Sequence, residues 1–359
     1  MKKFSVQPDI RKASTLPTDF YTSDAVFEEC TEKIFTKSWL YLADALTVAQ
    51  SGQYQPINLL PQLLDEPLLI SRDHNGKLHC LSNVCTHRGK IIAETAGKGR
   101  MLSCGYHGRC FRLDGSFKSM PGFEQTEDFP TAKDDLPSLP IHNWHGMLFS
   151  SLDPAVPFRQ WIAKVDQRIG WLPLDTLEYH AETSADYHVD AHWALYCDNF
   201  LEGFHIPFVH PALNDALEVD QYETETFEYG VLQIGIAEEG QTCFDPPPGH
   251  QDHGRRIYAY YYWLFPNIML NFYPWGISVN LIQGRTKSST DVLFRSYKFK
   301  DTPYEITDSQ IDQTEIEDEA VVLSVQRGIR SRLYHQGRFS ATHEKGVHHF
   351  HRLIAQALE

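Results

Sequence analysis

The sequence predicts an α+β protein that combines a small all-β unit with segments of mixed helix and sheet. Short apolar runs alternate with turn residues between about residues 52 and 152. Aromatic-rich runs that suit strands lie at 257–283 and 290–299, and helical patterns lie at 20–45 and from about 314 onward. A chain of 359 residues has room for two compact domains, or for one domain with a large insertion.

The composition predicts a protein with a large core and no membrane association. Hydrophobic residues make up 42% of the chain, and no apolar run approaches the ~20 residues that span a bilayer. A net charge of -15 disfavours nucleic acid as a partner. Seven cysteines, an odd number, and the absence of an apolar segment after Met1–Ser5 predict a cytoplasmic protein.

Two short turns define the predicted all-β unit. The step Asn75-Gly76 separates two short apolar runs and predicts a hairpin. The step Asp114-Gly115 repeats this pattern after Cys110–Arg112. Ahead of this unit, the helical spacing of apolar residues predicts a helix over 20–45.

The chain becomes mixed after Pro154. A helical stretch is expected to run into the segment Asp198–His210, and Pro207 and Pro211 are expected to end it. The last part, from about Thr314, is expected to be helical to the C-terminus.

Four residues in the β unit form a predicted metal cluster. Cys85 and His87 stand in one loop, and Cys104 and His107 stand in another. Two thiolates and two imidazoles are the ligands of a [2Fe-2S] centre in which the cysteines hold one iron and the histidines hold the other. A structural zinc site and chance are the alternatives, but zinc ligands more often pair as C-x2-C and H-x3-5-H.

A second predicted metal site lies in the segment Asp198–His210. On a helix Glu202 and His205 would share one face, and His210 would follow past the proline. Two imidazoles and one carboxylate on one side of Fe(II) leave positions open for dioxygen and substrate. A lone pair of histidines at this spacing is more often part of a core or a surface.

Both motifs resemble those of a known family. Cys85–Gly89 and Cys104–Gly108 look like the two halves of the Rieske motif. Together with Asp198–His210 they resemble the α subunit of Rieske non-heme iron oxygenases along essentially the whole chain. Gly105 and Arg109 stand where the family often has Pro and Trp, and we expect these departures to change packing or surface rather than the cluster.

This resemblance implies an architecture and an assembly. It implies an all-β Rieske domain, residues 46–152, inserted in a helix-grip catalytic domain with an antiparallel sheet. The catalytic domain would comprise a helical segment, 1–45, and residues 153–359. The subunits would form a homotrimer or a multiple of one, because the cluster of one subunit serves the iron of the next.

The resemblance also implies roles for the acidic residues. Glu202 becomes the bridge between a cluster histidine of the neighbouring subunit and His205, not an iron ligand. The third ligand to the mononuclear Fe(II) is then expected to be Asp318, because the family has an acid pair ahead of a Gln and because Asp318 shares a helix face with apolar residues. These apolar residues are Val322, Val325 and Ile329. Glu317 lies on a face of the same helix that is less apolar.

The implied reaction uses O2 and electrons from NAD(P)H to hydroxylate a small molecule. No G-x-G-x-x-G motif occurs in the chain, so a separate flavin and iron-sulfur reductase is expected to supply the electrons. A Rieske electron-transfer protein without oxygenase activity is an alternative, but it needs only the β unit.

The aromatic strands bear on the substrate. Tyr260–Asn267 and Asn271–Gly276 offer ring faces that bind quaternary ammonium groups well, although such residues also fill cores. The tail segments Val325–Ser331 and Gly346–His351, with Glu202, resemble the branch that acts on choline, carnitine or betaines. Demethylation or C-N cleavage is therefore expected. Aromatic ring hydroxylation or O-demethylation is the alternative.

Overall fold

The computed structural model describes residues 4–304 and 308–359, the latter with side chains from 313 onward. Two compact units are present, one formed by Met1–Phe35 with Val156–Glu359 and the other by Thr36–Ala155. Helices and sheets occur together in the larger unit, so the predicted α+β class is confirmed. The domain boundaries after residues 45 and 152 stay predictions.

The unit Thr36–Ala155 is built from three small antiparallel sheets, with strand orders β1-β11-β10, β5-β2-β3-β4-β9 and β6-β7-β8. The strands are β1 (Leu40–Asp44), β2 (Gln53–Leu59), β3 (Glu66–Arg72), β4 (Leu78–Ser82), β5 (Gly97–Lys98), β6 (Leu102–Ser103), β7 (Cys110–Phe111), β8 (Phe117–Ser119), β9 (Ser138–Leu139), β10 (Ile141–Trp144) and β11 (Met147–Ser150). Both predicted hairpins are confirmed, and Gly76 and Gly115 adopt φ angles of 83° and 87° in their turns.

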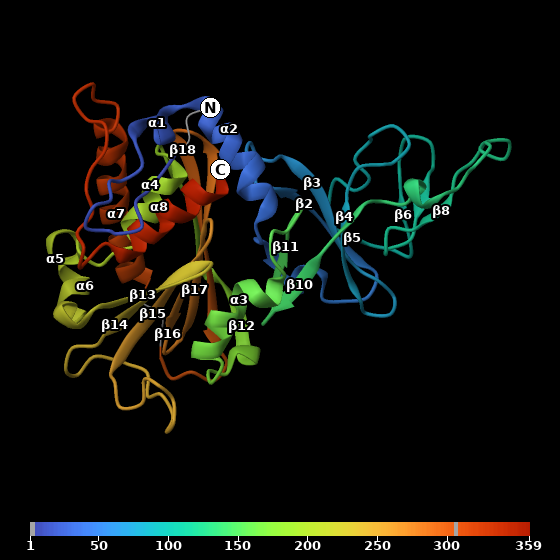
Figure 1. Cartoon of the computed structure of the whole chain (residues 1–359). Helices are drawn as coiled ribbons and strands as arrows, with labels where there is room; N and C mark the ends of the chain where they lie inside the picture. Colours follow the sequence, from blue (N-terminus) through green and yellow to red (C-terminus); the bar gives the residue numbers. More distant parts are fainter. Residues whose placement is uncertain (1–3, 305–307) are drawn as a thin grey trace. The chain divides into compact units, whose positions relative to one another are not determined.

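The larger unit contains an antiparallel sheet of seven strands in the order β12-β18-β17-β16-β15-β14-β13 (Figure 1). The strands are β12 (Leu177–Val189), β13 (Glu223–Phe227), β14 (Gly230–Ile236), β15 (Ile257–Leu264), β16 (Ile268–Tyr273), β17 (Gly276–Thr286) and β18 (Ser289–Phe299). The aromatic-rich runs form β15 to β18, as predicted. The first three strands were not predicted; β12 and β13 consist mostly of polar residues and show no clear alternation of apolar and polar positions.

The helices of the larger unit are α1 (Thr18–Thr22), α2 (Asp24–Lys33), α3 (Phe158–Ile169), α4 (Trp193–Phe200), α5 (Ile206–Val209), α6 (Pro211–Ala216), α7 (Asp308–Gly328) and α8 (Lys345–Ala357). No helix among the described residues is both long enough and apolar enough to cross a bilayer. Helices α4, α7 and α8 lie together against the sheet (Figure 1). Trp193 of α4, Phe350 of α8 and Trp263 of β15 pack edge to face between them.

The predicted helix over 20–45 is wrong beyond Lys33. Residues 40–44 instead form β1, in which Leu40 and Tyr41 lie opposite Ser150 and Phe149 of β11. Pairing with a neighbouring strand overrides the local helical spacing of the apolar residues in this stretch.

The predicted helix from Thr314 to the C-terminus is also wrong in its continuity. Helix α7 ends at Gly328, and α8 begins only at Lys345. A Cβ atom at Gly346 would lie 2.3 Å from the carbonyl oxygen of Leu201, so α8 approaches the chain after α4 as closely as only a glycine permits.

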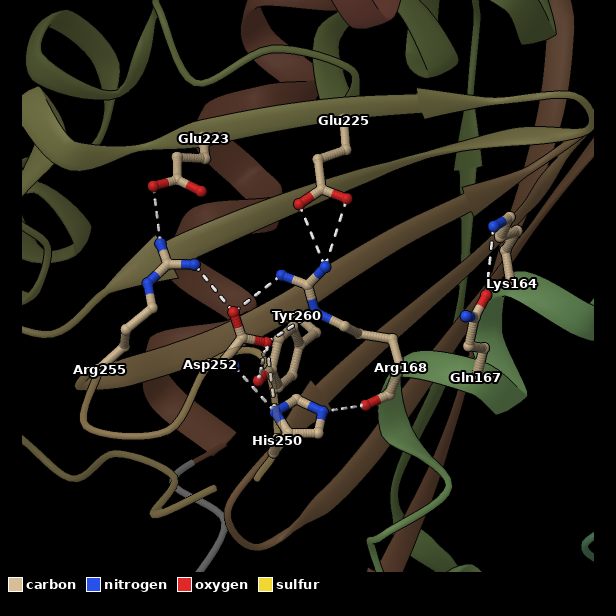
Figure 2. Close-up of polar contacts among 9 residues, drawn as sticks. All are labelled: Lys164, Gln167, Arg168, Glu223, Glu225, His250, Asp252, Arg255 and Tyr260. Atoms are coloured by element: carbon tan, nitrogen blue, oxygen red, sulfur yellow. Dashed lines mark hydrogen bonds and ion pairs between the residues drawn. The ribbon is translucent and has the colours of Figure 1, made fainter. Parts of the chain in front are cut away.

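A buried ion-pair network ties α3 to the sheet (Figure 2). The Nε and Nη2 atoms of Arg168 donate to the two carboxylate oxygens of Asp252 over 2.6 and 2.9 Å. Tyr260 and Arg255 also donate to Asp252, and Glu225 of β13 accepts from Arg168 (Figure 2). Asp252 therefore anchors the loop between β14 and β15.

We predict that Asp252→Asn destabilises the larger unit by about 3 kcal/mol, because the guanidinium of Arg168 would stay buried without its anion. Chemical unfolding measures this loss. Glu223→Gln is the matched control, because Glu223 is a half-exposed partner of Arg255 and contributes about 1 kcal/mol or less. Equal effects of the two substitutions would contradict the importance of burial.

The loss of stability in Asp252→Asn should also depend on pH. Burial would raise the pKa of Asp252, but hydrogen bonds from Arg168, Tyr260 and Arg255 outweigh it and hold the pKa below the usual value. A carboxylate with a lowered pKa stabilises the fold above its unfolded pKa of about 4, and this stabilisation is lost at lower pH. The stability difference between wild type and Asp252→Asn should therefore shrink as the pH falls below about 4.

Candidate metal centres

His205, His210 and Asp318 come together in the larger unit although they are far apart in the sequence. The two Nε2 atoms lie 3.1 Å apart. The Oδ1 atom of Asp318 lies 3.0 Å from the Nε2 atom of His210 and 3.5 Å from that of His205. This is the group of three ligand atoms in the described chain that is close enough to share one metal ion.

The spacing of these atoms fits a metal ion. Ligand atoms about 2.1 Å from one ion, in neighbouring positions around it, lie about 3 Å apart. Two imidazoles and one carboxylate on one side are the donor set of non-heme Fe(II) sites with open positions. Glu202, the alternative ligand, is not part of the triangle.

The segment that carries the histidines is not a continuous helix, so the prediction that Glu202 and His205 share a helix face is wrong. Helix α4 ends at Phe200. A Cβ atom at Gly203 would lie 2.8 Å from the ring of Tyr222, which shows how closely that ring approaches the backbone. Glu202 accepts hydrogen bonds from the backbone N–H groups of Phe204 and His205 and so stabilises the turn.

The sequence predicts that Pro207 and Pro211 end a helix, and this prediction is wrong. Each proline instead lies at the start of a new short helix. Pro207 lies in the first turn of α5, and Pro211 lies in the first turn of α6. A proline fits there because the first turn of a helix needs no N–H donor. These short helices place His210 between them.

Each imidazole is oriented by a carboxylate on its far side. The Nδ1 atom of His205 donates to Glu202 over 2.7 Å, and the Nδ1 atom of His210 donates to Glu317 over 2.8 Å. With Nδ1 held in this way, each Nε2 atom faces Asp318 and would be the atom that binds a metal ion. This role of Glu317 was not predicted from the sequence, although an acid directly before the expected ligand is a signal for it.

Asp318 lies on α7 and is held from α4 by Asn199, whose Nδ2 atom donates to Oδ1 over 2.5 Å. The buried stripe of α7 runs through Glu315, Val322 and Gln326, and the buried Ile329 follows directly after the helix. Val325, expected on this face, is 41% exposed, because Gln326 takes the inward position at that turn. The buried Gln326 accepts from the backbone N–H of His192.

The acids and imidazoles shift one another's pKa values. Burial would lower the pKa of His205, but Asp318 and Glu202 outweigh it and raise the pKa to about 9. Burial would raise the pKa of Asp318, but the two imidazoles outweigh it and lower the pKa to about 2. The site therefore concentrates negative charge around two imidazoles and attracts cations.

The predicted cluster site of Cys85, His87, Cys104 and His107 lies in the unit Thr36–Ala155, where two loops adopt the same conformation. The N–H of Cys85 donates to the carbonyl of Lys90, and the N–H of Cys104 donates to the carbonyl of Arg109. In each loop the glycine four residues after the cysteine donates back to the cysteine carbonyl, with φ angles of 72° at Gly89 and 71° at Gly108.

The two loops bring the four predicted cluster residues together. Cys85 and Cys104 are buried in the apolar core of this unit, and burial, with the neighbouring Cys104 thiol, raises the pKa of Cys85. The rings of His87 and His107 lie 4.8 Å apart, nearer the surface. Buried thiols below two accessible imidazoles fit a [2Fe-2S] cluster with the cysteines on its inner iron.

Arg109, a departure from the family pattern, affects packing as expected. Its side chain is buried, with the guanidinium 5.0 to 5.6 Å from the rings of Phe111, Phe117 and Phe129. It also pairs with Asp134 over 2.7 Å. Arg109 therefore packs against aromatic rings, as an aromatic residue would, and also forms an ion pair.

A cavity of about 730 Å³ lies beside the triangle of His205, His210 and Asp318 in the larger unit. Its floor is a row across four neighbouring strands, in which Gln233 lies opposite Tyr261, Tyr261 opposite Asn271, and Asn271 opposite Ser278. The sheet register therefore aims these side chains at the same space.

Aromatic residues line much of this cavity. Tyr273 and Trp275 stack with ring centres 5.1 Å apart, and Tyr261 stands at 81° to Tyr273. Tyr260 and Tyr262 are fully buried and do not line it. Strand alternation thus divides the predicted aromatic run into core residues and cavity residues.

The histidines of the tail segment Gly346–His351 have structural partners. His351 bonds to Asp198 over 2.8 Å and accepts from the backbone of Leu16. His348 and His349 each donate to a backbone carbonyl, of Gln7 and Phe227 respectively. These contacts fix α8 rather than add to the cavity.

Comparison with known proteins places both units. Residues 38–132 match the family model of the Rieske [2Fe-2S] domain, and residues 174–359 match that of the ring hydroxylating alpha subunit (catalytic domain). A solved structure of the quaternary ammonium Rieske monooxygenase CntA with an inhibitor is 28% identical, with a TM-score of 0.80 and complete coverage of both chains. Naphthalene 1,2-dioxygenase with bound indole, at 16% identity and a TM-score of 0.74, shares the fold.

Curated relatives are similar along nearly the whole chain. Choline monooxygenase from Beta vulgaris is 29% identical over 97% of this chain and 78% of its own length. The carnitine monooxygenase oxygenase subunit of Acinetobacter baumannii is 29% identical over 98% of this chain and 96% of its own. These matches confirm the predicted Rieske cluster, mononuclear iron and oxygenase class. The chain belongs to the ring hydroxylating alpha subunit family of Rieske non-heme iron oxygenases.

Proposed function

We propose that this chain is a terminal oxygenase component that oxidises a quaternary ammonium compound with O2. The observation that carries the proposal is the cavity beside His205, His210 and Asp318, which joins aromatic faces to acidic side chains. Among its described lining residues there is no lysine or arginine. A cation is the ligand that such a wall favours. The relatives named for choline and carnitine support this substrate class.

The ligand assignments are part of the proposal. His205, His210 and Asp318 would hold the mononuclear Fe(II), and Cys85, His87, Cys104 and His107 would hold the cluster. When bound, the iron would supply dioxygen activation and the cluster would supply electrons. Glu202 and Glu317 orient the imidazoles through their Nδ1 atoms.

The aromatic wall would position the substrate. The ring of Tyr261 and the stacked pair of Tyr273 and Trp275 can form a wall against a trimethylammonium group, with a gain of about 0.5 to 2 kcal/mol for each good contact. This holds the carbons bound to nitrogen beside the triangle of ligand atoms. Oxidation at such a carbon leads to demethylation or C-N cleavage. The surrounding rings also exclude water from the reacting carbon.

We also propose that the chain works as a homotrimer or a multiple of one, with a separate flavin and iron-sulfur reductase. Glu202 would then link His205 to a cluster histidine of the neighbouring subunit. Phe204 and Phe208, which stand two and six positions after Glu202, are 47% and 81% exposed. Exposed aromatic residues beside a site suit a subunit contact.

Seven cysteines without a disulfide support a cytoplasmic location.

An oxygenase for aromatic rings or aryl ethers is the second candidate, because the same wall can stack on a ring. The acidic lining disfavours the aromatic acids among such substrates. A Rieske electron-transfer protein is not supported, because the larger unit builds a complete second donor set.

A substrate screen tests the proposal. Purified protein, loaded with iron, is supplied with NADH and a surrogate reductase, and O2 uptake is compared with product formation. We expect coupled uptake with choline, carnitine or betaines and none with benzoate or anisate analogues. Coupled product formation with the aromatic compounds alone would overturn the proposal.

We predict that Trp275→Leu raises KM for the ammonium substrate about tenfold, which corresponds to about 1.4 kcal/mol of lost cation–π interaction. Steady-state kinetics measures the change. Tyr262→Phe is the matched control, because Tyr262 is buried away from the cavity and its hydroxyl has no hydrogen-bond partner in the described part of the chain. An unchanged KM in Trp275→Leu would argue against the aromatic wall as the binding surface.

The metal assignment predicts an iron count. Wild type should hold about three irons per chain, two in the cluster and one outside it. His205→Ala and Asp318→Ala should lose the single iron and keep the cluster spectrum. His188→Ala, which changes a half-exposed histidine, should keep all three irons and the cluster spectrum. Retention of the single iron in Asp318→Ala, with its loss in Glu202→Ala, would exchange the roles of the two acids.

A further inference from the structure

We infer that the ion pair of Arg109 and Asp134 sets the reduction potential of the Rieske cluster. The guanidinium stabilises the reduced cluster, and the carboxylate limits that effect. The inference rests on the proposed cluster ligands and goes beyond the proposed function, because it gives two residues outside the ligand set a role in electron transfer. The position, burial and charge of the pair carry it, all within the unit Thr36–Ala155.

The pair lies between the two cluster loops. Thr86, the residue between the two ligands of one loop, donates its hydroxyl to the carbonyl oxygen of Asp134 over 2.9 Å. The Nη2 atom of Arg109, two positions after His107 of the other loop, donates to the same oxygen over 3.0 Å. It also donates to the carboxylate of Asp134 over 2.7 Å. The guanidinium is therefore separated from the hydroxyl of Thr86 by a single carbonyl oxygen.

The positive partner is enclosed by the protein. Arg109 is 2% exposed, and its guanidinium lies 5.0 to 5.6 Å from the ring centres of Phe111, Phe117 and Phe129. Its Nε atom is buried and has no hydrogen-bond partner in the described part of the chain. The three rings exclude water and leave the positive charge weakly screened, because a charge acts more strongly where the local dielectric constant is low.

The negative partner is closer to water and shares its charge with a second donor. The side chain of Asp134 is 19% exposed, and its Oδ2 atom accepts from the backbone N–H of Thr131 over 2.8 Å. Water and this N–H group weaken the field of the carboxylate. The cation is therefore the less screened partner, and the pair acts on its surroundings as a partial positive charge.

Electron uptake makes the cluster more negative. One electron from the reductant converts one ferric iron to ferrous, and no covalent bond is formed or broken. A weakly screened cation beside a centre held by two thiolates and two neutral imidazoles therefore favours the reduced form. Arg109 stands at a position where the family often has tryptophan, which carries no charge.

A redox titration tests the inference. The iron-loaded protein is titrated with dithionite and ferricyanide at pH 7, and the reduced cluster is followed by electron paramagnetic resonance. Arg109→Met removes the charge and keeps an apolar side chain against the rings. We expect the equilibrium constant for reduction to fall at least about tenfold, which is about 59 mV for one electron. An unchanged potential in this variant would overturn the inference.

Asp134→Asn tests the sign of the effect. The substitution keeps an oxygen beside Arg109 and removes the negative charge, so the potential should rise, and the double variant should lie between the two single variants. Arg112→Met is the matched control and should keep the wild-type potential, because Arg112 is exposed to water. A merely structural pair would shift the potential in the same direction in both single variants, and that result would overturn the inference.

A conservative variant separates charge from packing. Arg109→Lys keeps the charge and should restore most of the potential that Arg109→Met loses; a potential as low as that of Arg109→Met would overturn the role of charge. If Arg109→Met does not hold the cluster, the direction of the shift in Asp134→Asn decides. A wild-type protein without the spectrum of a Rieske cluster would overturn the proposed ligands as well. A Rieske spectrum whose potential responds to neither charge would overturn the inference alone.

Discussion

The arrangement of the larger unit depends on one electrostatic constraint, which is the concentration of carboxylates where α4, α5 and α7 meet. Asp318 is surrounded by two imidazoles, and each imidazole carries a further acid, Glu202 or Glu317, on its outer nitrogen. Buried carboxylates are stable only with positive charge or hydrogen-bond donors beside them. The fold supplies donors such as Asn199 and backbone N–H groups, and it leaves room for cations.

The sheet forms the opposite wall of the binding site and determines which side chains face it. Its antiparallel register aligns Gln233, Tyr261, Asn271 and Ser278 across four strands, and strand alternation sends the other aromatic residues into the core. The network of Arg168 and Asp252 anchors the loop that carries Gln241 and Thr242 into the cavity lining. Ion pairs distant from the triangle of ligand atoms thus support the wall that faces it.

Local patterns in the sequence predicted the parts of the structure that short segments determine. The hairpins at Gly76 and Gly115 follow from turn chemistry, and the paired loops of Cys85 and Cys104 follow from ligand spacing. Asp318 was selected over Glu317 by periodicity together with the resemblance to a known family. The cavity composition could not be read from these patterns.

The features that were missed depend on tertiary contacts. The place of Gln233 in the cavity lining depends on the register of β14 and β15, and that of Glu315 on the contact between α7 and α4. A turn at Gly203 replaces the predicted helix, and the ring of Tyr222 lies so close to it that a Cβ atom at Gly203 would be 2.8 Å away. The strand at residues 40–44 likewise results from pairing with β11, which helical spacing does not reveal.

The most direct measurement is a crystal structure of the iron-loaded protein, grown without oxygen and soaked with choline. The account predicts one iron bound by His205, His210 and Asp318, with the ammonium group against Tyr261, Tyr273 and Trp275. Iron bound by Glu202 with Asp318 turned away, or choline outside this cavity, would contradict it.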